Sequence, residues 1–253
     1  MKHGSWPVGA DRANSGEVIR TRESIVKAIT ETVLVRTAVG KPLPENPKTC
    51  RMFETDFLEK FSRIHPATPF VVYIPIVLAA FYRSHQRGAG ALTELGIAAA
   101  GLLTWTLAEY VLHRYVFHWT NDTAWGRRFH FMAHGVHHDF PSDGDRLVMP
   151  LLTSIPLAFL FYGLFYLAFG STAHADPFFA GFAIGYLGYD GTHYAIHHFK
   201  QTSRVGKLVK RHHMLHHHAD HDGGFGVSSP LWDVIFRTMP QVKKLRATRS
   251  AAE

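Results

Sequence analysis

Four long apolar runs, separated by polar segments, restrict what this chain of 253 residues can fold into. They cover Pro66 to Tyr82, Ala91 to Leu112, Leu147 to Phe169 and Pro177 to Tyr189. A helix needs about 20 apolar residues to cross the roughly 30 Å of hydrocarbon in a bilayer. The first and last runs are shorter, so they span only if they extend to Arg83 and Phe199, and are otherwise interfacial or partly re-entrant. We predict an all-α integral membrane protein with four transmembrane helices in two hairpins, in preference to a soluble bundle with buried core helices.

The basic residues are unevenly distributed along the chain. Eleven Lys and Arg lie in residues 1–65, four in 114–146 and ten in 200–249, which leaves only Arg83 and Arg87 elsewhere. Short loops rich in Lys and Arg stay on the cytoplasmic side of a membrane. We therefore expect outer turns at Arg83–Gly90 and Gly170–Asp176, with both termini and every histidine cluster in the cytoplasm. The first sixty residues lack the apolar core of a signal peptide, which agrees with a cytoplasmic N-terminus.

Composition also predicts the domain organisation. We expect a polar N-terminal segment at 1–62, a membrane domain at 63–240 and a basic tail at 241–253. In the first segment, Ile25, Ile29 and Val33 recur at helical spacing among charged residues, which indicates a weakly amphipathic, interfacial helix. The stretch Gly40 to Lys48 has three prolines and is expected to be a linker.

Charge and cysteine content exclude several classes of protein. The formal net charge is +7 with His neutral, but the basic residues are dispersed and form no base-reading motif. A surface that lies against anionic lipid headgroups explains this charge better than a nucleic-acid surface. The single cysteine, Cys50, permits no intrachain disulfide and no CxxC site. Any metal must therefore be bound by histidine.

Nineteen histidines are present, and many repeat at helical spacing beside the apolar runs. Residues three or four apart share a helix face. Three groups satisfy this rule, whereas one pair is five apart and requires its helix to end or unwind near Tyr115. The resulting candidate ligands are His113, His118, His134, His137, His138, His193, His197, His213, His216 and His217. Ten imidazoles suit two metal ions with five nitrogens each, and this coordination number favours iron over tetrahedral zinc.

Carboxylates and a further histidine lie beside these candidate ligands. Glu109 precedes His113 by one turn, so it is expected either to accept the N–H of that imidazole or to pair with Arg114. Asp190, one turn before His193, is the second candidate for orienting an imidazole or positioning a substrate. His130, one turn before His134, is a candidate for the same supporting role. The glycine-rich and aromatic segment after His221 is expected to form a loop that packs back under the site.

Several motifs resemble one known superfamily. They are LHRYVFH at 112–118, HFMAHGVHH at 130–138, THYAIHH at 192–198, HHMLHH at 212–217, PSDGDRLVMP at 141–150 and GFGVSSPLWDVIF at 224–236. The pattern resembles the membrane fatty acid hydroxylase and sterol desaturase superfamily, and within it the fatty acid 2-hydroxylases, over about residues 66–238. This resemblance implies four transmembrane helices, a cytosolic helical cap that holds two iron ions, and the same ten histidine ligands. It also implies that Tyr189 and Asp190, which match a Tyr-Asp pair beside the third histidine box, position the substrate.

The resemblance further implies hydroxylation of a fatty acyl chain at the carbon next to the carbonyl, free or sphingolipid-linked. Breaking an unactivated C–H bond exceeds what acid–base side chains achieve, so metal, O₂ and two electrons are required. The related eukaryotic enzymes usually carry a fused b-type cytochrome, for which the N-terminal segment is too short. We therefore expect a separate electron-donor protein and a bacterial inner-membrane location. Zinc binds such ligands more tightly than ferrous iron and is expected to replace it in purified samples.

Two other functions remain open at this stage. One is a sterol or carotenoid hydroxylase or desaturase on the same scaffold. The other, from a different class, is a histidine-rich metal transporter, which would place polar ligands midway through the membrane spans. The candidate ligands gather instead at one end of the apolar runs.

Overall fold

The computed structural model describes residues 48–241, and all regular structure in this range is helical. The predicted amphipathic helix around Ile29, the linker up to residue 47 and the tail from 242 lie outside the described residues. Internal contacts divide the chain into two units between Glu59 and Lys60. Only the short helix α2 (Asp56–Phe61) crosses that boundary. The second unit contains all the histidines that the sequence singles out.

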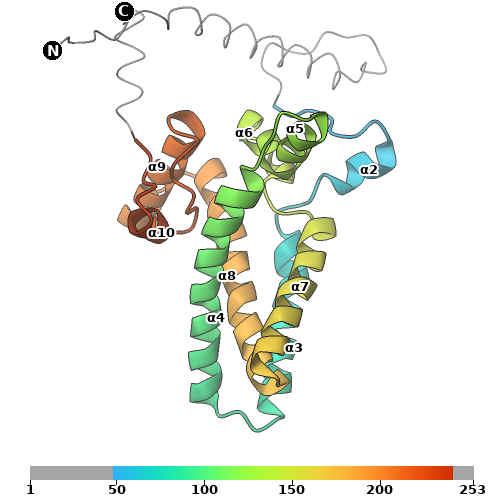
Figure 1. The fold of residues 1–253 in the computed structure, drawn as a ribbon, viewed down its shortest axis with the longest axis vertical. Coiled ribbons are helices and arrows are strands. Elements are labelled where there is room, and N and C mark those ends of the chain that lie inside the picture. The colour runs from blue at the N-terminus through green and yellow to red at the C-terminus, as the bar shows by residue number, and fades with distance from the viewer. Residues whose placement is uncertain (1–47, 242–253) are drawn as a thin grey trace, which may run out of the picture. The chain divides into compact units, whose positions relative to one another are not determined.

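Four long helices form two hairpins in this second unit (Figure 1). They are α3 (Thr68–His85), α4 (Ala91–Leu112), α7 (Leu151–Phe169) and α8 (Thr172–His198). Each predicted apolar run therefore forms one helix. The predicted turn at Gly170–Asp176 is too long, because only Gly170 and Ser171 separate α7 from α8. Gly170 ends α7 with a left-handed φ of 63°, and the Ser171 hydroxyl caps α8 by accepting from the Ala173 amide.

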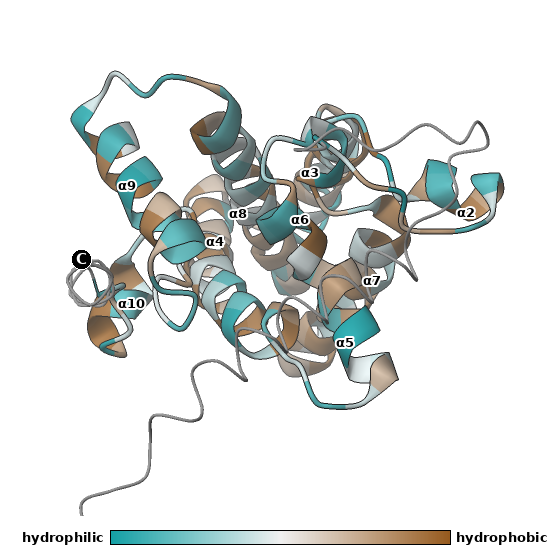
Figure 2. Ribbon diagram, turned by 90° about the horizontal axis from the view of Figure 1, so that it is seen from above, coloured by the Kyte–Doolittle hydropathy of each residue, from teal (hydrophilic) through white to brown (hydrophobic). Residues whose placement is uncertain are grey.

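The shorter helices lie at one end of the four long ones (Figure 1). They are η1 (His113–Phe117), α5 (Ala124–His130), η2 (Phe131–Gly135), α6 (Val136–Asp139), η3 (Gly144–Arg146), α9 (Arg204–His218) and α10 (Leu231–Ile235). Helices α5, η2 and α6 follow one another without a break. Gly135 has a helical φ of −57°, so the glycine does not interrupt this helical stretch. Viewed from above, α6 and α9 carry much of the hydrophilic colour (Figure 2).

Helix α8 is the centre of the bundle and contacts α3, α4 and α7. Its aromatic face meets Tyr73 of α3 and Trp105 of α4, with Tyr186 in edge contact with both rings. Two glycines bring the backbones of α4 and α8 together. A Cβ at Gly181 would overlap the Ala98 carbonyl, and a Cβ at Gly101 would overlap the Phe178 carbonyl. Small residues commonly allow such close approach between helices in membranes.

The outer surface of the long helices is apolar. In α7 only Ser154 is buried, whereas Leu152, Phe159 and Leu167 are 73%, 73% and 78% exposed. Soluble proteins rarely expose so large an apolar face. Two helical segments, Ala91–Phe117 and Gly144–Phe169, are long and apolar enough to cross a bilayer. Together these features indicate a membrane protein.

A cluster of polar side chains lies at the end of the bundle where the α3–α4 and α7–α8 turns are. The buried Asp176 carboxylate of α8 accepts two hydrogen bonds from the Arg83 guanidinium of α3 and one from the Tyr162 hydroxyl of α7. Arg83 also donates to Tyr162 at 2.7 Å. This pairing neutralises the charge of Arg83 and joins three of the four long helices.

Candidate dimetal centre

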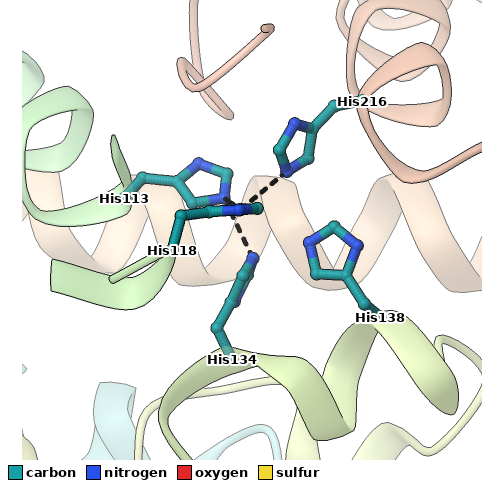
Figure 3. A group of neighbouring side chains, drawn as sticks. All are labelled: His113, His118, His134, His138 and His216. Atoms are coloured by element: carbon teal, nitrogen blue, oxygen red, sulfur yellow. Dashed lines mark hydrogen bonds between the residues drawn. The ribbon is translucent and has the colours of Figure 1, made fainter. Parts of the chain in front are cut away.

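The ten predicted histidines converge as two groups of five. Site 1 consists of His113, His118, His134, His138 and His216 (Figure 3). Site 2 consists of His137, His193, His197, His213 and His217. Within each site, one nitrogen per ring lies within 4.8 Å of the corresponding nitrogens of the other four. The imidazoles come from helical segments distant in sequence, so only the folded bundle assembles them.

A π-helix explains how histidines five residues apart reach the same site. The segment His113–Phe117 is π-helical, and the His118 amide donates to the His113 carbonyl at 3.1 Å. A π-turn closes its hydrogen bond over five residues rather than four. The widened turn brings His118 back beside His113, with ring centroids 4.9 Å apart. The predicted unwinding near Tyr115 therefore takes the form of a local widening of the helix.

Two helices contribute to both sites. In α6 the adjacent residues His137 and His138 enter site 2 and site 1, respectively. In α9 His213 and His217, one turn apart, enter site 2, whereas His216 enters site 1. The helical cap thus joins the two sites through shared backbone, which the spacing rule alone does not show.

The distances between ring nitrogens fit metal coordination. In site 2 the Nε2 atom of His193 lies 2.9 Å from that of His137 and 3.0 Å from that of His213. In site 1 the Nε2 atom of His118 lies 3.2 Å from that of His113 and 3.1 Å from that of His216. Two nitrogens about 2.1 Å from one ion, at right angles, would be about 3.0 Å apart. The donor set therefore fits two ions with imidazole ligands.

Burial keeps these imidazoles neutral, which is the form that binds a metal. Desolvation, followed by the nearby His216, lowers the pKa of His118 to about 3. Desolvation also lowers the pKa of His216 to about 4, against an opposing hydrogen bond to the Gly223 carbonyl. The pKa values of His134, His137 and His213 are lowered in the same way, first by burial and then by neighbouring imidazoles.

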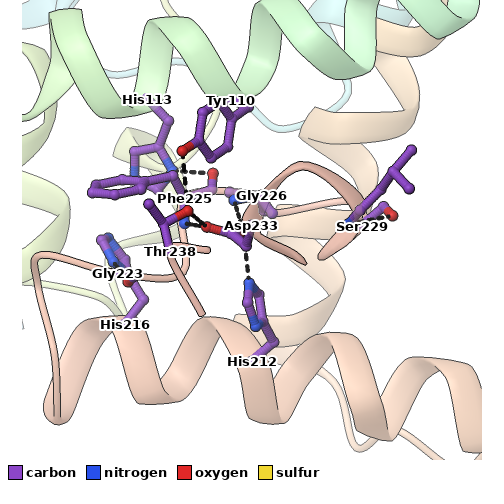
Figure 4. Close-up of polar contacts among 12 residues, drawn as sticks. Tyr110, His113, His212, His216, Gly223, Phe225, Gly226, Ser229, Asp233 and Thr238 are labelled. Atoms are coloured by element: carbon purple, nitrogen blue, oxygen red, sulfur yellow. Dashed lines mark hydrogen bonds and ion pairs between the residues drawn. The ribbon is translucent and has the colours of Figure 1, made fainter. Parts of the chain in front are cut away.

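The loop after α9 supplies hydrogen-bond acceptors to site 1 (Figure 4). The His113 Nδ1–H donates to the Phe225 carbonyl at 2.6 Å, and the His216 Nδ1–H donates to the Gly223 carbonyl at 2.8 Å. A carbonyl oxygen only accepts, so these bonds assign the proton to Nδ1 and leave Nε2 free. The predicted loop under the site is thus present and orients two imidazoles.

Glu109 supports this loop and hydrogen-bonds to residues of the loop rather than to His113 or Arg114. Its carboxylate accepts from the amides of Val227 and Ser228, both at 2.7 Å, and from the Ser228 hydroxyl. Both expected partners are occupied elsewhere, since His113 donates to the Phe225 carbonyl and Arg114 donates to the Tyr110 hydroxyl. Glu109 therefore acts on the site through the backbone of residues 225–228.

The remaining predicted residues border the sites. The Tyr189 ring lies 5.6 Å from that of His193, and the fully buried Asp190 carboxylate lies beside the Tyr186 side chain and the Met149 backbone. His130 belongs to neither group of five. Its Nδ1 lies 3.1 Å from the Phe117 carbonyl at the end of the π-helix, and its ring is 6.1 Å from that of His118.

Sequence reasoning missed Asp233, which is fully buried and organises the loop. Its carboxylate accepts from the Phe225 and Gly226 amides at 2.9 and 2.7 Å, from His212 Nε2 at 3.1 Å and from the Thr238 hydroxyl at 2.7 Å. Burial alone would raise the pKa of this carboxyl, but the four hydrogen bonds, that of His212 foremost, hold it below its usual value. The available signal was an acidic residue within the apolar run LWDVIF.

Fold and site together define a class: a helical membrane protein with two adjacent five-histidine groups that could each hold a metal ion. The family model for fatty acid hydroxylases matches residues 98–238, and the chain belongs to this family. The match covers α4 from Ala98 onward, both five-histidine sites and the Asp233 loop.

Individual relatives agree. The dihydroceramide fatty acyl 2-hydroxylase FAH1 of Arabidopsis thaliana is 38% identical over 78% of this chain and 82% of its own length. The fatty acid 2-hydroxylase of Rattus norvegicus is 33% identical over 75% of this chain and 56% of its own. The solved structure of full-length scs7p, in which only the hydroxylase domain is visible, has 33% identity and a TM-score of 0.69, and covers 74% of this chain and 71% of that one. The chain is therefore a hydroxylase that acts on fatty acyl chains.

Proposed function

We propose that this protein is a membrane-bound di-iron oxygenase that hydroxylates a fatty acyl chain, free or sphingolipid-linked, at the 2-position. The observation that carries the proposal is the convergence of ten neutral imidazoles into two groups of five beside an apolar bundle. The names of the relatives support the acyl substrate and the 2-position. The ligands are the ten histidines of sites 1 and 2.

Two iron ions, when bound, would supply the redox chemistry that uses O₂ and two electrons to hydroxylate a C–H bond. Both sites offer only nitrogen donors, so the protein leaves the positive charge of the ions undiminished. Zinc exceeds ferrous iron in affinity for such ligands and replaces it in a purified sample. The protein holds each imidazole neutral and places most of them out of contact with water, since seven of the ten are buried.

Tyr189 and Asp190 are proposed to position the substrate. Asp190 is fully buried in α8, one helical turn before the site 2 residue His193, with the Tyr186 side chain beside its carboxylate. Tyr189 lies against the site 2 residue His193. A substrate hydroxyl or amide that reaches Asp190 would thereby lie beside site 2. His130 is proposed to hold the end of the π-helix that carries His118.

An apolar cavity is available for an acyl chain. A cavity of about 370 Å³ lies between α3, α7 and α8, with Ile76, Ile155 and Phe159 among its lining residues. It shares Tyr73 and Phe179 with a smaller apolar cavity that reaches Leu112 and Met149. Ligand sites are typically apolar clefts of this size with a few polar groups. We propose that the acyl tail enters this path from the bilayer.

The proposed topology has four spans. Helix α3 has 18 residues and α8 has 27, which correspond to about 27 and 40 Å at 1.5 Å per residue. In this topology both turns face outward, and the termini and the helical cap lie in the cytoplasm of a bacterial cell. A separate protein supplies the electrons.

Lipid analysis of cells that express the chain tests this function. We expect acyl chains that gain the mass of one oxygen atom at the carbon next to the carbonyl, with the oxygen derived from ¹⁸O₂ rather than H₂¹⁸O. The His137→Ala variant should lose metal, and its product should fall by more than about 100-fold, because losing a ligand costs more than losing a ligand's hydrogen-bond partner.

The control is His85→Ala, at an exposed histidine at the end of α3, which should retain full product. Metal uptake into cells without any oxygenated lipid would instead favour the transporter. Oxygen on a sterol or carotenoid rather than an acyl chain would favour the alternative substrate class.

A further inference from the structure

We propose that the two sites hold their metal ions with unequal strength, site 1 more tightly than site 2, and that Asp233 is the positioning residue that makes site 1 the tighter one. This inference rests on the proposed function only in that both sites bind metal. It concerns the hydrogen bonds made by the ring nitrogens that face away from the ions.

The two sites differ in what surrounds their Nδ1 atoms. In site 1 the Nδ1–H groups of His113 and His216 donate to backbone carbonyls, and only His138 has a buried Nδ1 without a partner. In site 2 four of the five Nδ1 atoms, those of His137, His193, His213 and His217, are buried without a partner among the described residues. Binding an ion through Nε2 requires the proton to be on Nδ1. Site 2 therefore leaves four buried donors unsatisfied, whereas site 1 is partly pre-oriented.

The two carbonyls that accept from site 1 belong to peptide groups whose N–H also makes a hydrogen bond, on the side away from the imidazole (Figure 4). A trans peptide directs its C=O and its N–H in opposite directions. The peptide whose carbonyl accepts from His113 is that of Phe225 and Gly226, and its N–H donates to the Asp233 carboxylate at 2.7 Å. The peptide whose carbonyl accepts from His216 has its N–H, that of Gly224, bonded to the Thr238 carbonyl at 2.7 Å.

Asp233 also holds Thr238, whose carbonyl accepts from the Gly224 N–H. The Thr238 amide donates to the Asp233 carbonyl at 2.8 Å, and the Thr238 hydroxyl donates to the Asp233 carboxylate. The loop also requires glycine, because Gly224 has a φ of +81° and a Cβ at Gly226 would overlap the Ser229 carbonyl. A single buried carboxylate thus fixes both acceptors, and both acceptors serve site 1. Within residues 48–241, no backbone carbonyl or carboxylate accepts a hydrogen bond from the buried Nδ1 atoms of His137, His193, His213 and His217 in site 2.

The test is a metal titration of the purified, full-length chain after its metals have been removed. Co²⁺ alone is the probe, and its visible absorption together with competition by a chelator gives the two affinities. We expect two steps, with the first at least about 10-fold tighter than the second. His216→Ala should abolish the tight step and His193→Ala the weak one.

Asp233→Asn should weaken the tight step by about 10- to 100-fold, the usual effect of removing the partner of a ligand, and leave the weak step within about 3-fold. The matched control is Asp176→Asn, an equally buried aspartate whose partners are Arg83 and Tyr162, and it should change neither step. If Asp233→Asn yields no folded protein by circular dichroism, Thr238→Val removes the hydroxyl that bonds to Asp233 and to Tyr110, and it should weaken the tight step in the same direction.

Two equal steps in the wild type, or equal weakening of both steps by Asp233→Asn, would overturn the inference while leaving the dimetal function intact. A wild-type chain that binds no Co²⁺ at either site would remove the proposed function itself.

Discussion

The Glu109 carboxylate connects a long helix to the loop that supports the metal centre. It is 3% exposed and accepts three hydrogen bonds from two consecutive residues, Val227 and Ser228. A buried donor that loses its acceptor costs about 1–3 kcal/mol. The effect of a substitution at Glu109 therefore depends on how many of these donors keep a partner.

Glu109→Leu should destabilise the fold by at least about 2 kcal/mol, because two buried amides and one hydroxyl lose their acceptor. Glu109→Gln should cost much less, since its amide oxygen still accepts from both backbone amides and its NH₂ group donates to the Ser228 hydroxyl. Thermal unfolding in detergent measures both variants. Equal losses for Gln and Leu would show that the charge, rather than the hydrogen bonds, holds the loop.

Residue spacing predicted which ten histidines lie close together, but not which five belong to each site. Spacing of three or four within α9 groups His213, His216 and His217, yet the structure assigns His216 to site 1 and the other two to site 2. The division depends on where α6 and η1 approach α9, which is tertiary information. The sequence also could not predict the hydrogen-bond partner of His113, because the partner is the backbone carbonyl of Phe225 and every residue has such a carbonyl. Asp233 was visible only as a charge in an apolar run.

At the scale of elements, the contact between α4 and α8 is set by glycine. Gly181 of α8 lies against the Ala98 carbonyl of α4, so even a methyl group there must separate the two backbones. Since His113 follows directly after α4, in η1, and α8 carries His193, the separation of α4 and α8 also fixes the distance between parts of the two sites.

Gly181→Ala should lower stability by about 1–3 kcal/mol, the usual cost of overpacking a well-filled interior. The matched control is Gly163→Ala in α7, where a Cβ meets nothing within 4 Å, and alanine there should be neutral or slightly stabilising. Thermal unfolding of both variants in the same detergent provides the comparison. A larger loss for Gly163→Ala than for Gly181→Ala would contradict this account of the interface.

The apolar runs predicted all four long helices but underestimated α8. The run Pro177–Tyr189 covers less than half of the 27-residue helix, because its ends contain Asp176, Asp190 and the site 2 histidines. Asp176 is buried by pairing with Arg83, and the histidines converge on site 2. The hydropathy of these polar residues alone would exclude them from the helix. The π-helix at His113–Phe117 was predicted only as an unspecified distortion, since five-residue spacing does not distinguish widening from termination.

At the scale of the whole molecule, charge and chemistry separate along the bundle. All ten candidate ligands lie at the end with the short helices, and the turns between the paired long helices lie at the other end (Figure 1). Near those turns the charge of Arg83 is neutralised by Asp176, and Arg87 is an exposed basic residue. On the cap, α5 and α9 carry several exposed basic residues. Orientation by positive charge therefore predicts that the cap faces the cytoplasm.

Single cysteines test that orientation and the number of spans together. In a Cys50→Ser background, exposed positions at the two turns (Gln86→Cys after α3 and His174→Cys at the start of α8) and on the cap (Asp122→Cys and Lys207→Cys) each provide one thiol. A membrane-impermeant thiol reagent applied to intact spheroplasts should label both turn positions, and should label the cap positions only after the membrane is permeabilised. If only α4 and α7 crossed the bilayer, Gln86 and His174 would remain on the same side as each other but the lipid-facing surfaces of α3 and α8 would label as readily as the turns. Labelling of the cap in intact cells would reverse the orientation, and with it the compartment from which the electron donor must approach the two sites.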